Sequence, residues 1–327
     1  IETHGRADTE ALLRDLPQVP RRRVEYRGIA IEEMDLDGVL ARAPQIAVVD
    51  ELAHTNVPGS RNRKRYQDVL ELLSAGINVI GAFNIQHLES LNDLVERTTG
   101  VTVRETIPDS LLKQADQVVS LDLAVEDLLD RLRAGKIYRE DKIPWALHHF
   151  FKDENLQTLR ELALREVAES LERQVSERRR PGDEGAAPGK RVMVCMSSSP
   201  PRARALLRRG SRMAGRLSTD WFVVYVETPR EAPHRIDSEA QRHLLDNIQL
   251  ARELGAEVVR LKGRDAAAAL LDFARSHNVG HLIVGRSPPQ RRSLAHLLGR
   301  TVLQRLVEEA ADLDLHIIAL EAEEERP

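Results

Sequence analysis

Short apolar runs alternate with longer amphipathic stretches along residues 1–140. Runs of about four to eight residues that are rich in β-branched side chains predict strands, whereas apolar residues at helical spacing predict helices. Strands are expected in this way at residues 23–26, 46–49, 78–83, 101–104 and 116–122. Strands that alternate with helices of about ten residues are typical of βαβ units, so this segment is predicted to form a parallel sheet.

Ile46–Val49 is the apolar run around which the first segment is organised. Four apolar residues are too few for a helix and suit a strand that is buried on both faces of a parallel sheet. Asp50 and Glu51 follow directly, at the sheet edge where ligands of open α/β sheets bind. A carboxylate there holds a magnesium ion through water, as the Walker B aspartate does in P-loop nucleotidases. A strand that ends at a solvated turn is the alternative, and these six residues leave both open.

The rest of the chain divides into a helical segment, a linker and a second α/β segment. Residues 141–178 show only helical spacing and are interpreted as a helical connector. Residues 179–190 are rich in Arg, Gly, Pro and Glu, which is typical of a linker. Residues 191–322 again alternate strands with helices, and strands are expected at residues 192–196, 221–226, 257–261, 281–284 and 315–320.

Composition narrows the class of protein. The length of 327 residues suggests two domains, each large enough to bury its own core. The formal net charge of −4 gives no global basic field, which argues against a nucleic-acid partner. Aromatic residues make up 3% of the chain, and the cluster of Trp145, Phe150 and Phe151 is expected to dock onto one of the two α/β domains. The single cysteine, Cys195, fits a reducing compartment.

Two further features of the sequence are the lengths of its apolar runs and the residue on which it opens. No apolar run approaches the roughly 20 residues that span a bilayer. The chain opens on Ile1 without an initiating Met, which we interpret as the start of a fragment.

A phosphate-binding loop of the Walker A type, Gly-x-x-x-x-Gly-Lys-Ser/Thr, does not occur in the sequence. Gly185–Lys190 is one residue short, Arg191 replaces the Ser or Thr, and the run precedes a strand instead of following one. No group of His and Cys residues has the spacing of a structural zinc site. The basic run at residues 61–65 is expected to be a solvated face, and a phosphate or partner contact is the alternative.

Several stretches carry a family resemblance. They are Val49–Ser60, Asn84–Asn92, Arg104–Asp109, Gly135–Tyr138 and Asn155–Leu164. Together they resemble the N-terminal cytoplasmic domain of KdpD-type potassium sensor histidine kinases over nearly all of residues 1–175. Residues 191–322 resemble, more loosely, the universal-stress-protein-like domain that follows it in that family, through Val192–Ser199 and Trp221–Pro229.

The resemblance implies a P-loop-type parallel-sheet α/β domain over residues 1–140, whose phosphate loop lies upstream of Ile1 in the family. It implies that Asp50 and Glu51 are catalytic, and that Asp50 holds magnesium through water when a nucleotide is bound. The other nucleotide-binding residues expected by this analogy are His54, Thr55, Asn56, Asn84, Gln86, Arg104 and Pro108. A plain turn is the alternative for the loop that contains His54.

The second α/β domain departs from the ligand-binding motifs that the resemblance implies. Universal-stress domains that bind ATP carry Gly-x-x-Gly-x9-Gly-Ser/Thr, and here Pro288, which lacks an N–H donor, replaces the second Gly. Relatives that bind cyclic di-AMP carry a Ser-x-Ser, which is present, and an aromatic segment from which Trp221–Tyr225 departs. We therefore expect an anion-binding cup for an unknown ligand, formed by Ser197, Ser199, Gly285, Ser287, Gly299 and Thr301.

The function implied by the resemblance is that of a cytoplasmic regulatory input region of a bacterial two-component sensor histidine kinase that controls potassium uptake genes. The expected cofactor is ATP with magnesium in the first domain. The expected partners are the kinase core and membrane segment of the same protein, a response regulator and a candidate nucleotide second messenger. The alternative is a P-loop kinase or ATPase activity of the first domain that acts on Ser or Thr hydroxyls.

Overall fold

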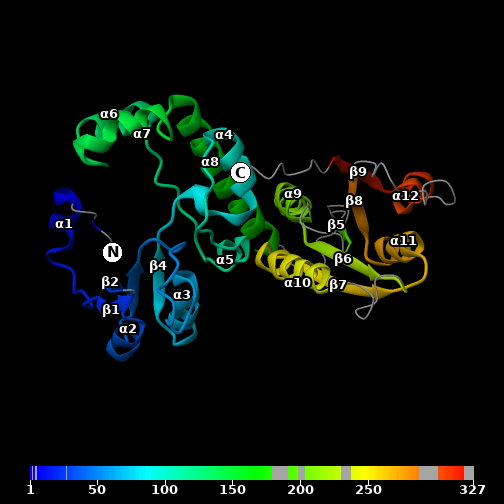
Figure 1. Ribbon diagram of the computed structural model, residues 1–327, viewed down its shortest axis with the longest axis horizontal. Helices are drawn as coiled ribbons and strands as arrows, with labels where there is room; N and C mark the ends of the chain where they lie inside the picture. Colours follow the sequence, from blue (N-terminus) through cyan, green and yellow to red (C-terminus); the bar gives the residue numbers. More distant parts are fainter. Residues whose placement is uncertain are drawn as a thin grey trace. The chain divides into compact units, whose positions relative to one another are not determined.

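The computed structural model describes the chain except residues 2, 4, 5, 27, 179–190, 198–202, 230–236, 287–300 and 320–327. The chain divides into two compact units (Figure 1). Unit 1 comprises Ile1–Ile107 and Val119–Arg165, and unit 2 comprises Pro108–Val118 and Glu166–Pro327. The functional domain boundaries expected from the sequence stay predictions.

Unit 1 contains two small sheets among its described residues. Strands β1 (Arg22–Tyr26) and β2 (Ile29–Glu33) form an antiparallel hairpin. Strands β3 (Ile46–Val49) and β4 (Asn78–Gly81) pair in parallel, with Val48 opposite Ile80. The predicted strands at residues 101–104 and 116–122 are wrong, since both segments lack strand structure. Residues 101–104 alternate apolar with polar side chains and residues 116–122 contain two adjacent valines, but neither pattern supplies a neighbouring strand to pair with.

The β3–β4 sheet is buried on one face. Ala47 and Val49 are buried, whereas Ile46, Val48 and Ile80 are 57%, 51% and 59% exposed. The prediction that the Ile46–Val49 strand is buried on both faces is therefore wrong for one face. Its short apolar run has the composition of a doubly covered strand, although within the described residues only one side is covered.

Some helices of unit 1 precede or connect these strands, and the others follow β4 in the chain. They are α1 (Ala7–Leu13), α2 (Leu36–Arg42), α3 (Arg65–Ser74), η1 (Ile85–His87), η2 (Glu89–Leu91), α4 (Asn92–Thr99), α6 (Val125–Arg133), η3 (Glu140–Lys142), α7 (Ile143–His148) and the first part of α8 (Asp153–Arg178). Helix α3 packs against β4, with Leu72 fully buried. A single loop joins β3 to α3, so the start of α3 fixes the C-terminal end of that loop.

Helices α6, α7 and α8 share a hydrophobic core within unit 1. Phe151 is 9% exposed, and its ring makes edge contacts with Tyr138 at 5.7 Å and with Phe150 at 5.5 Å between centroids. Trp145 is 63% exposed. The expected docking of the aromatic cluster thus holds for Phe151 and partly for Phe150, whereas Trp145 lies at the surface.

Unit 2 is built on a five-stranded sheet in which all described neighbours are parallel. Its strands, in the spatial order β7-β6-β5-β8-β9, are β7 (Glu257–Lys262), β6 (Trp221–Glu227), β5 (Arg191–Met196), β8 (Val279–Arg286) and β9 (Asp314–Ala319). The described helices of the unit are α5 (Asp109–Lys113), α9 (Ala203–Arg216), α10 (Ser238–Glu253), α11 (Ala266–Ser276) and α12 (Val302–Glu309), with the second part of α8. The predicted mixed α/β fold with a parallel sheet is confirmed by this unit.

Both faces of the unit 2 sheet are covered. Helices α9 and α10 contribute to one core with the side chains on one face, and α11 and α12 contribute to another core with those on the opposite face. Gly210 allows α9 to approach the sheet closely, because a Cβ there would lie 2.9 Å from Trp221 Cζ3 and would also collide with Val194. No helix of the described part of the chain is long and apolar enough to cross a membrane.

The aromatic core of unit 1 generates a stability prediction. Phe151→Ala is expected to lower the free energy of unfolding by about 3–5 kcal/mol, because a buried ring leaves a cavity. Trp145→Ala should change it by less than about 0.5 kcal/mol, as for an exposed side chain. Urea unfolding followed by circular dichroism, together with amide exchange in α6, α7 and α8, measures both variants. Equal effects of the two substitutions would contradict the assignment of Phe151 to the core.

Candidate functional site

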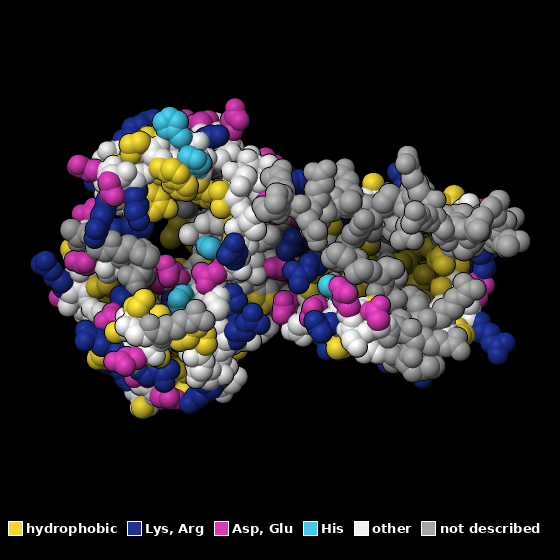
Figure 2. Space-filling view, in the orientation of Figure 1, with side chains coloured by type: hydrophobic (Ala, Val, Ile, Leu, Met, Phe, Trp, Pro, Cys, Tyr) yellow, Lys and Arg dark blue, Asp and Glu magenta, His cyan; other side chains and the backbone are white. Residues whose placement is uncertain are grey.

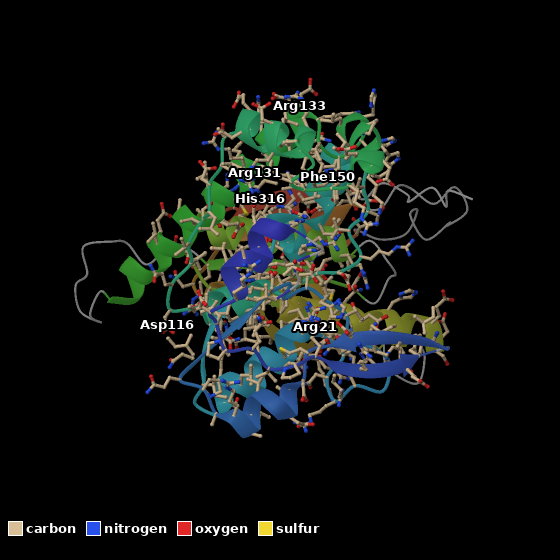
Figure 3. The ribbon with its side chains drawn as sticks, turned by 90° about the vertical axis from the view of Figure 1, so that its left-hand side faces the viewer. Arg21, Asp116, Arg131, Arg133, Phe150 and His316 are labelled. Atoms are coloured by element: carbon tan, nitrogen blue, oxygen red, sulfur yellow. The ribbon has the colours of Figure 1, made fainter. Side chains whose placement is uncertain are left out.

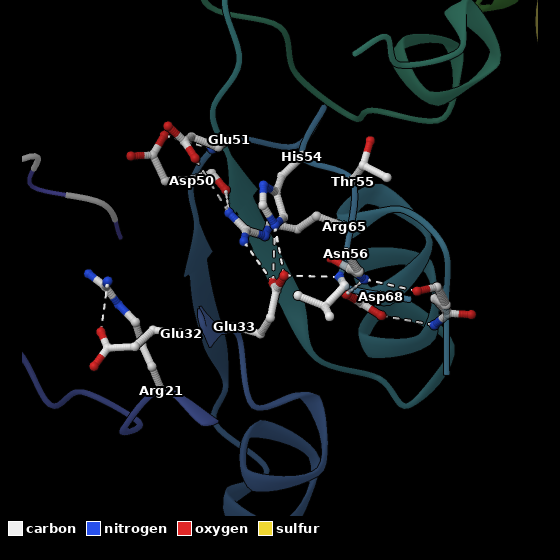
Figure 4. A network of polar contacts seen from close by, with 12 residues as sticks. Arg21, Glu32, Glu33, Asp50, Glu51, His54, Thr55, Asn56, Arg65 and Asp68 are labelled. Carbon is white, nitrogen blue, oxygen red and sulfur yellow. Dashed lines mark hydrogen bonds and ion pairs between the residues drawn. The ribbon is translucent and has the colours of Figure 1, made fainter. Parts of the chain in front are cut away.

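The candidate site of unit 1 begins at the carboxyl end of β3, where Asp50 and Glu51 lie (Figure 4). Glu51 has a φ of 52°, a left-handed conformation that is uncommon for a residue with a side chain. Its N–H donates to Asp50 Oδ1 at 2.8 Å. Strained backbone of this kind is concentrated at functional sites, so the turn itself marks this edge as a candidate.

A buried carboxylate, Glu33 at the end of β2, holds the loop that follows. Glu33 is 3% exposed. His54 Nε2 lies 3.1 Å from both of its carboxylate oxygens, so this ring nitrogen is the donor. The N–H of Val57 donates to Glu33 Oε1 at 3.1 Å. These donors, with the guanidinium of Arg65, compensate the cost of burying the charge.

Arg65, the first residue of α3, connects this carboxylate to the acidic edge. Its Nη2 lies 3.5 Å from Glu33 Oε2, and its Nη1 donates to the backbone oxygen of Asp50 at 3.3 Å. The same Nη1 lies 3.8 Å from Glu51 Oε2. The Arg65 side chain is only 12% exposed, so the expectation that the whole basic run at residues 61–65 is solvated is wrong for Arg65. We call Glu33, His54 and Arg65 the carboxylate clasp.

A second polar cluster anchors the same loop to α3. Asn56 Nδ2 donates to Asp68 Oδ2 at 2.8 Å and to the backbone oxygen of Asn62 at 3.1 Å. Asn62 Nδ2 donates to Asp68 Oδ1 at 3.0 Å. Burial raises the pKa of Asp68 above its ordinary value, although the hydrogen bonds from Asn62 and Asn56 oppose the shift. Asn56 therefore has a structural contact within the chain, which the sequence-based analogy did not include.

Thr55 joins the loop to the segment before α5. Its N–H donates to Glu105 Oε1 at 2.7 Å, and Lys64 Nζ donates to its hydroxyl at 2.8 Å. Burial raises the pKa of Glu105, but the hydrogen bonds from Thr55 outweigh this and the pKa lies below its ordinary value. His87 Nδ1 lies 2.7 Å from the backbone oxygen of Glu105, which can only accept, so this nitrogen donates.

The remaining residues predicted for the first site lie on neighbouring segments. Asn84 is exposed and precedes η1, and Gln86 lies within η1. Arg104 is exposed in the segment that leads to Glu105. Pro108 is buried before α5, which belongs to unit 2. Their assignment to a nucleotide stays a prediction.

The donor set at this edge suits a magnesium ion, because carboxylates and water are its preferred ligands. The described residues around Asp50 include no glycine-rich loop, so they offer magnesium ligands without a phosphate cradle. Two polar atoms close by, Asn56 Oδ1 and Arg65 Nε, are buried without a hydrogen-bond partner among the described atoms. Among the described residues, no group of three or more His, Cys, Asp or Glu side chains has metal-binding geometry.

In unit 2 the structure brings two of the predicted cup residues to adjacent strand ends. Ser197 follows β5 and Gly285 lies near the end of β8, and these strands are neighbours. The strand order reverses between β5 and β8, which is where open parallel sheets bind ligands. Thr301 caps α12 by accepting the N–H of Gln304 at 3.2 Å. Ser199, Ser287 and Gly299 lie outside the described residues.

Glu33, Asp68 and Glu105 are not among the residues predicted for the site from the sequence, and Arg65 was predicted to be solvated. One of these had a signal in the sequence. Glu33 shares strand parity with the half-buried Ile31, so in the β1–β2 hairpin it faces the same side, although Ile29 on that side is 66% exposed. A carboxylate at an inward position of a strand indicates a buried partner. Asp68 and Glu105 lie among many charged residues and had no comparable signal.

Comparison with known proteins gives two family matches. A model described as the KdpD "Osmosensitive K+ channel His kinase sensor domain" matches residues 1–171, and a model of the universal stress protein family matches residues 189–318. The sensor protein KdpD of Escherichia coli (strain K12) is 44% identical over 322 residues, which cover 98% of this chain and 35% of that protein. The putative sensor protein KdpD of Synechocystis sp. is 43% identical over 320 residues, covering 98% of this chain and 84% of that protein.

Two solved structures are similar to part of this chain at lower sequence identity. A crystal structure of a universal stress protein in complex with cAMP has a TM-score of 0.32 and 21% sequence identity, with 41% of this chain and 100% of that chain covered. A universal stress protein from Archaeoglobus fulgidus has a TM-score of 0.30 and 19% identity, with 40% and 93% covered.

The carboxylate clasp generates a second stability prediction. Glu33→Ala leaves His54 and Arg65 without their shared acceptor and is expected to cost about 3–5 kcal/mol of unfolding free energy. Its neighbour Glu32 is an exposed carboxylate paired with Arg21 at 3.3 Å. Glu32→Ala is therefore the matched control and should cost less than about 1 kcal/mol. Urea unfolding of both variants measures the difference, and similar costs would show that the clasp does not hold the loop.

Asp68 generates a prediction of pH dependence. An aspartate in the unfolded chain titrates near about pH 3.9. Because the native pKa is raised, the unfolded state loses its proton first, and stability is expected to fall as the pH rises through the native pKa. Asp68→Asn should remove this fall. Urea unfolding at a series of pH values tests it, with the exposed Asp130→Asn as control; an unchanged slope in Asp68→Asn would refute it.

Proposed function

The chain belongs to the KdpD sensor family, and we propose that it is a nucleotide-linked regulatory input region of a potassium-sensing two-component histidine kinase. The relatives that it matches are named sensor proteins, and the chain spans 35% of the length of the Escherichia coli protein. We assign the phosphorelay chemistry to the remainder of such a protein. The region lies on the cytoplasmic side, next to the membrane segment and kinase core of the same protein.

The partners follow from this assignment. The whole protein passes its phosphoryl group to a response regulator, which controls potassium uptake genes. Unit 2 offers a second ligand site between the ends of β5 and β8, for which a nucleotide second messenger is the candidate. The alternative of a kinase or ATPase that acts on Ser or Thr hydroxyls is not favoured, because the relatives are named as sensors.

The acidic edge of unit 1 is the proposed regulatory nucleotide site. Asp50 and Glu51 are its magnesium-binding residues, and the bound magnesium would neutralise phosphate charge. Arg65 orients both residues, through the backbone oxygen of Asp50 and the carboxylate of Glu51. The observation that carries the proposal is this link from the acidic edge to Glu33 and, through it, to His54.

This arrangement couples the edge to the loop. A ligand that draws Glu51 toward a cation weakens its attraction to Arg65, and Arg65 also contacts the carboxylate that holds His54. The His54–Val57 loop therefore responds to what happens at the acidic edge. Asn84 and Gln86, which follow β4, are proposed to contact the nucleotide from the neighbouring strand end.

The experiment uses the intact natural protein in membranes and photolabelling with azido-ATP. Proteolysis and peptide mapping then separate label in the residues of this chain from label in the kinase core. Asp50→Ala is expected to reduce magnesium-dependent label in this region at least about tenfold, which corresponds to about 1.4 kcal/mol. Potassium-dependent autophosphorylation is expected to change with it.

Asp130→Ala, on the exposed side of α6, is the matched control for loss of one carboxylate. It should leave labelling unchanged. If Asp50 only holds local backbone, Asp50→Ala destabilises the fold by about 1–3 kcal/mol and leaves magnesium-dependent label intact, and the proposal fails.

A further inference from the structure

The turn between α6 and α8 exposes two large aromatic side chains. Trp145 of α7 is 63% exposed, and Tyr138, which precedes η3, is also exposed. In Figure 2, hydrophobic side chains and histidines gather at the end of unit 1 that carries α6 and α7 in Figure 1. Large exposed aromatics grouped together on a soluble surface are typical of an interaction site.

The surface is rigid because buried contacts fix its backbone. Asn155 Nδ2 donates to the backbone oxygens of His149 and Phe150 at 3.1 and 3.2 Å. The N–H of Phe151 donates to the oxygen of Ala146 at 2.9 Å. The Trp145 ring stacks on His149 with 4.4 Å between centroids, so it is held at the surface instead of folding into the core.

Basic side chains are frequent in the segment that carries these aromatics. Residues 131–152 contain six Lys or Arg and two acidic residues, a net charge of +4 in a chain whose net charge is −4, and one of the six, Arg133, is paired with Asp130 at 2.8 Å. The six are all exposed: Arg131, Arg133, Lys136, Arg139, Lys142 and Lys152. Figure 3 places Arg131, Arg133 and Phe150 at the same end of the molecule. We call these six residues, with Tyr138 and Trp145, the aromatic–basic surface.

We propose that the aromatic–basic surface docks onto an anionic lipid bilayer. Trp and Tyr favour the headgroup level of a membrane, because their rings are apolar and their tips are polar. Lys and Arg lay their apolar stems along the surface while their charges contact anionic headgroups. The partner is therefore a membrane surface with negative lipids. The inference does not depend on nucleotide binding at the Asp50 edge.

Two other occupants fit less well. A second copy of the same surface would bring two sets of positive charges together, which is repulsive. Single-stranded nucleic acid binds through bases stacked on open ring faces, and His149 covers one face of Trp145. The membrane requires neither an opposite charge on this chain nor an open ring face.

Tryptophan fluorescence tests the proposal directly, because the chain has two tryptophans in different environments. Trp221 is 1% exposed, so only Trp145 moves from water to an apolar environment on docking. The probes are vesicles of phosphatidylcholine alone and vesicles that also contain phosphatidylglycerol. Blue-shifted emission and co-sedimentation are expected with the anionic vesicles only, and added salt should weaken both.

Pairs of matched variants test which residues bind the bilayer. Lys142→Glu is expected to weaken binding at least roughly fivefold, the factor that corresponds to about 1 kcal/mol per cation at an anionic membrane. Arg22→Glu, which makes the same charge change on the exposed side of β1, should leave binding unchanged. Trp145→Ala should weaken binding several-fold, whereas Leu245→Ala, which removes an exposed apolar side chain from α10, should not.

Any of three results overturns the proposal. The first is absence of binding to anionic vesicles, and the second is binding that Trp145→Ala and Lys142→Glu leave unchanged. The third is that these variants alter the sedimentation coefficient or the affinity for a fluorescent oligonucleotide while lipid binding stays intact, which assigns the surface to a second copy or to nucleic acid.

Discussion

The buried carboxylate of Glu33 is the constraint on which the candidate site depends. A charge that is 3% exposed is tolerated only where several donors converge on it, and here they come from His54, Val57 and Arg65. Those donors lie on the loop after β3 and on the first turn of α3. Satisfying one carboxylate therefore fixes the path of the loop, the start of α3 and the orientation of Arg65 in a single step.

Arg65 links the carboxylate of Glu33 to the acidic edge. It contacts the backbone of Asp50 and the carboxylate of Glu51, which stands in a left-handed conformation. The Asn56–Asp68 pair and the Thr55–Glu105 contact hold the loop from two further sides. The loop is thus held at three points within unit 1, and one of them, the carboxylate clasp, links it to the acidic edge through Arg65.

The fold of unit 2 is stabilised by a different kind of contact. Its parallel sheet is covered on both faces by helices, and its polar residues of interest lie where the strand order reverses between β5 and β8. The loop after β3 in unit 1 is held by buried polar contacts, whereas the sheet of unit 2 is held by apolar packing on both faces. The two units therefore position their candidate sites by different means, unit 1 through buried hydrogen bonds and ion pairs and unit 2 through the ends of packed parallel strands.

The sequence by itself determined a large part of this description. The alternation of strands and helices in residues 191–322 was sufficient for the five-stranded α/β unit, because each strand there contains a run of apolar residues and pairs with a neighbour on the sheet. The family resemblance and the position of Asp50 and Glu51 after a strand also came from the sequence. Where the pattern was weaker, as at residues 101–104 and 116–122, it predicted strands that do not form.

Only the tertiary structure decided which polar residues meet. Glu33 and Arg65 are 32 positions apart, and Thr55 and Glu105 are 50 apart, so no local pattern joins them. Periodicity reports the face on which a residue lies, but a buried charge is explained by the donors that surround it, and those come from other elements. The same reason separates Phe151, which is buried, from Trp145, which is exposed: both are aromatic residues in one short segment, and only the packing of α6, α7 and α8 distinguishes them.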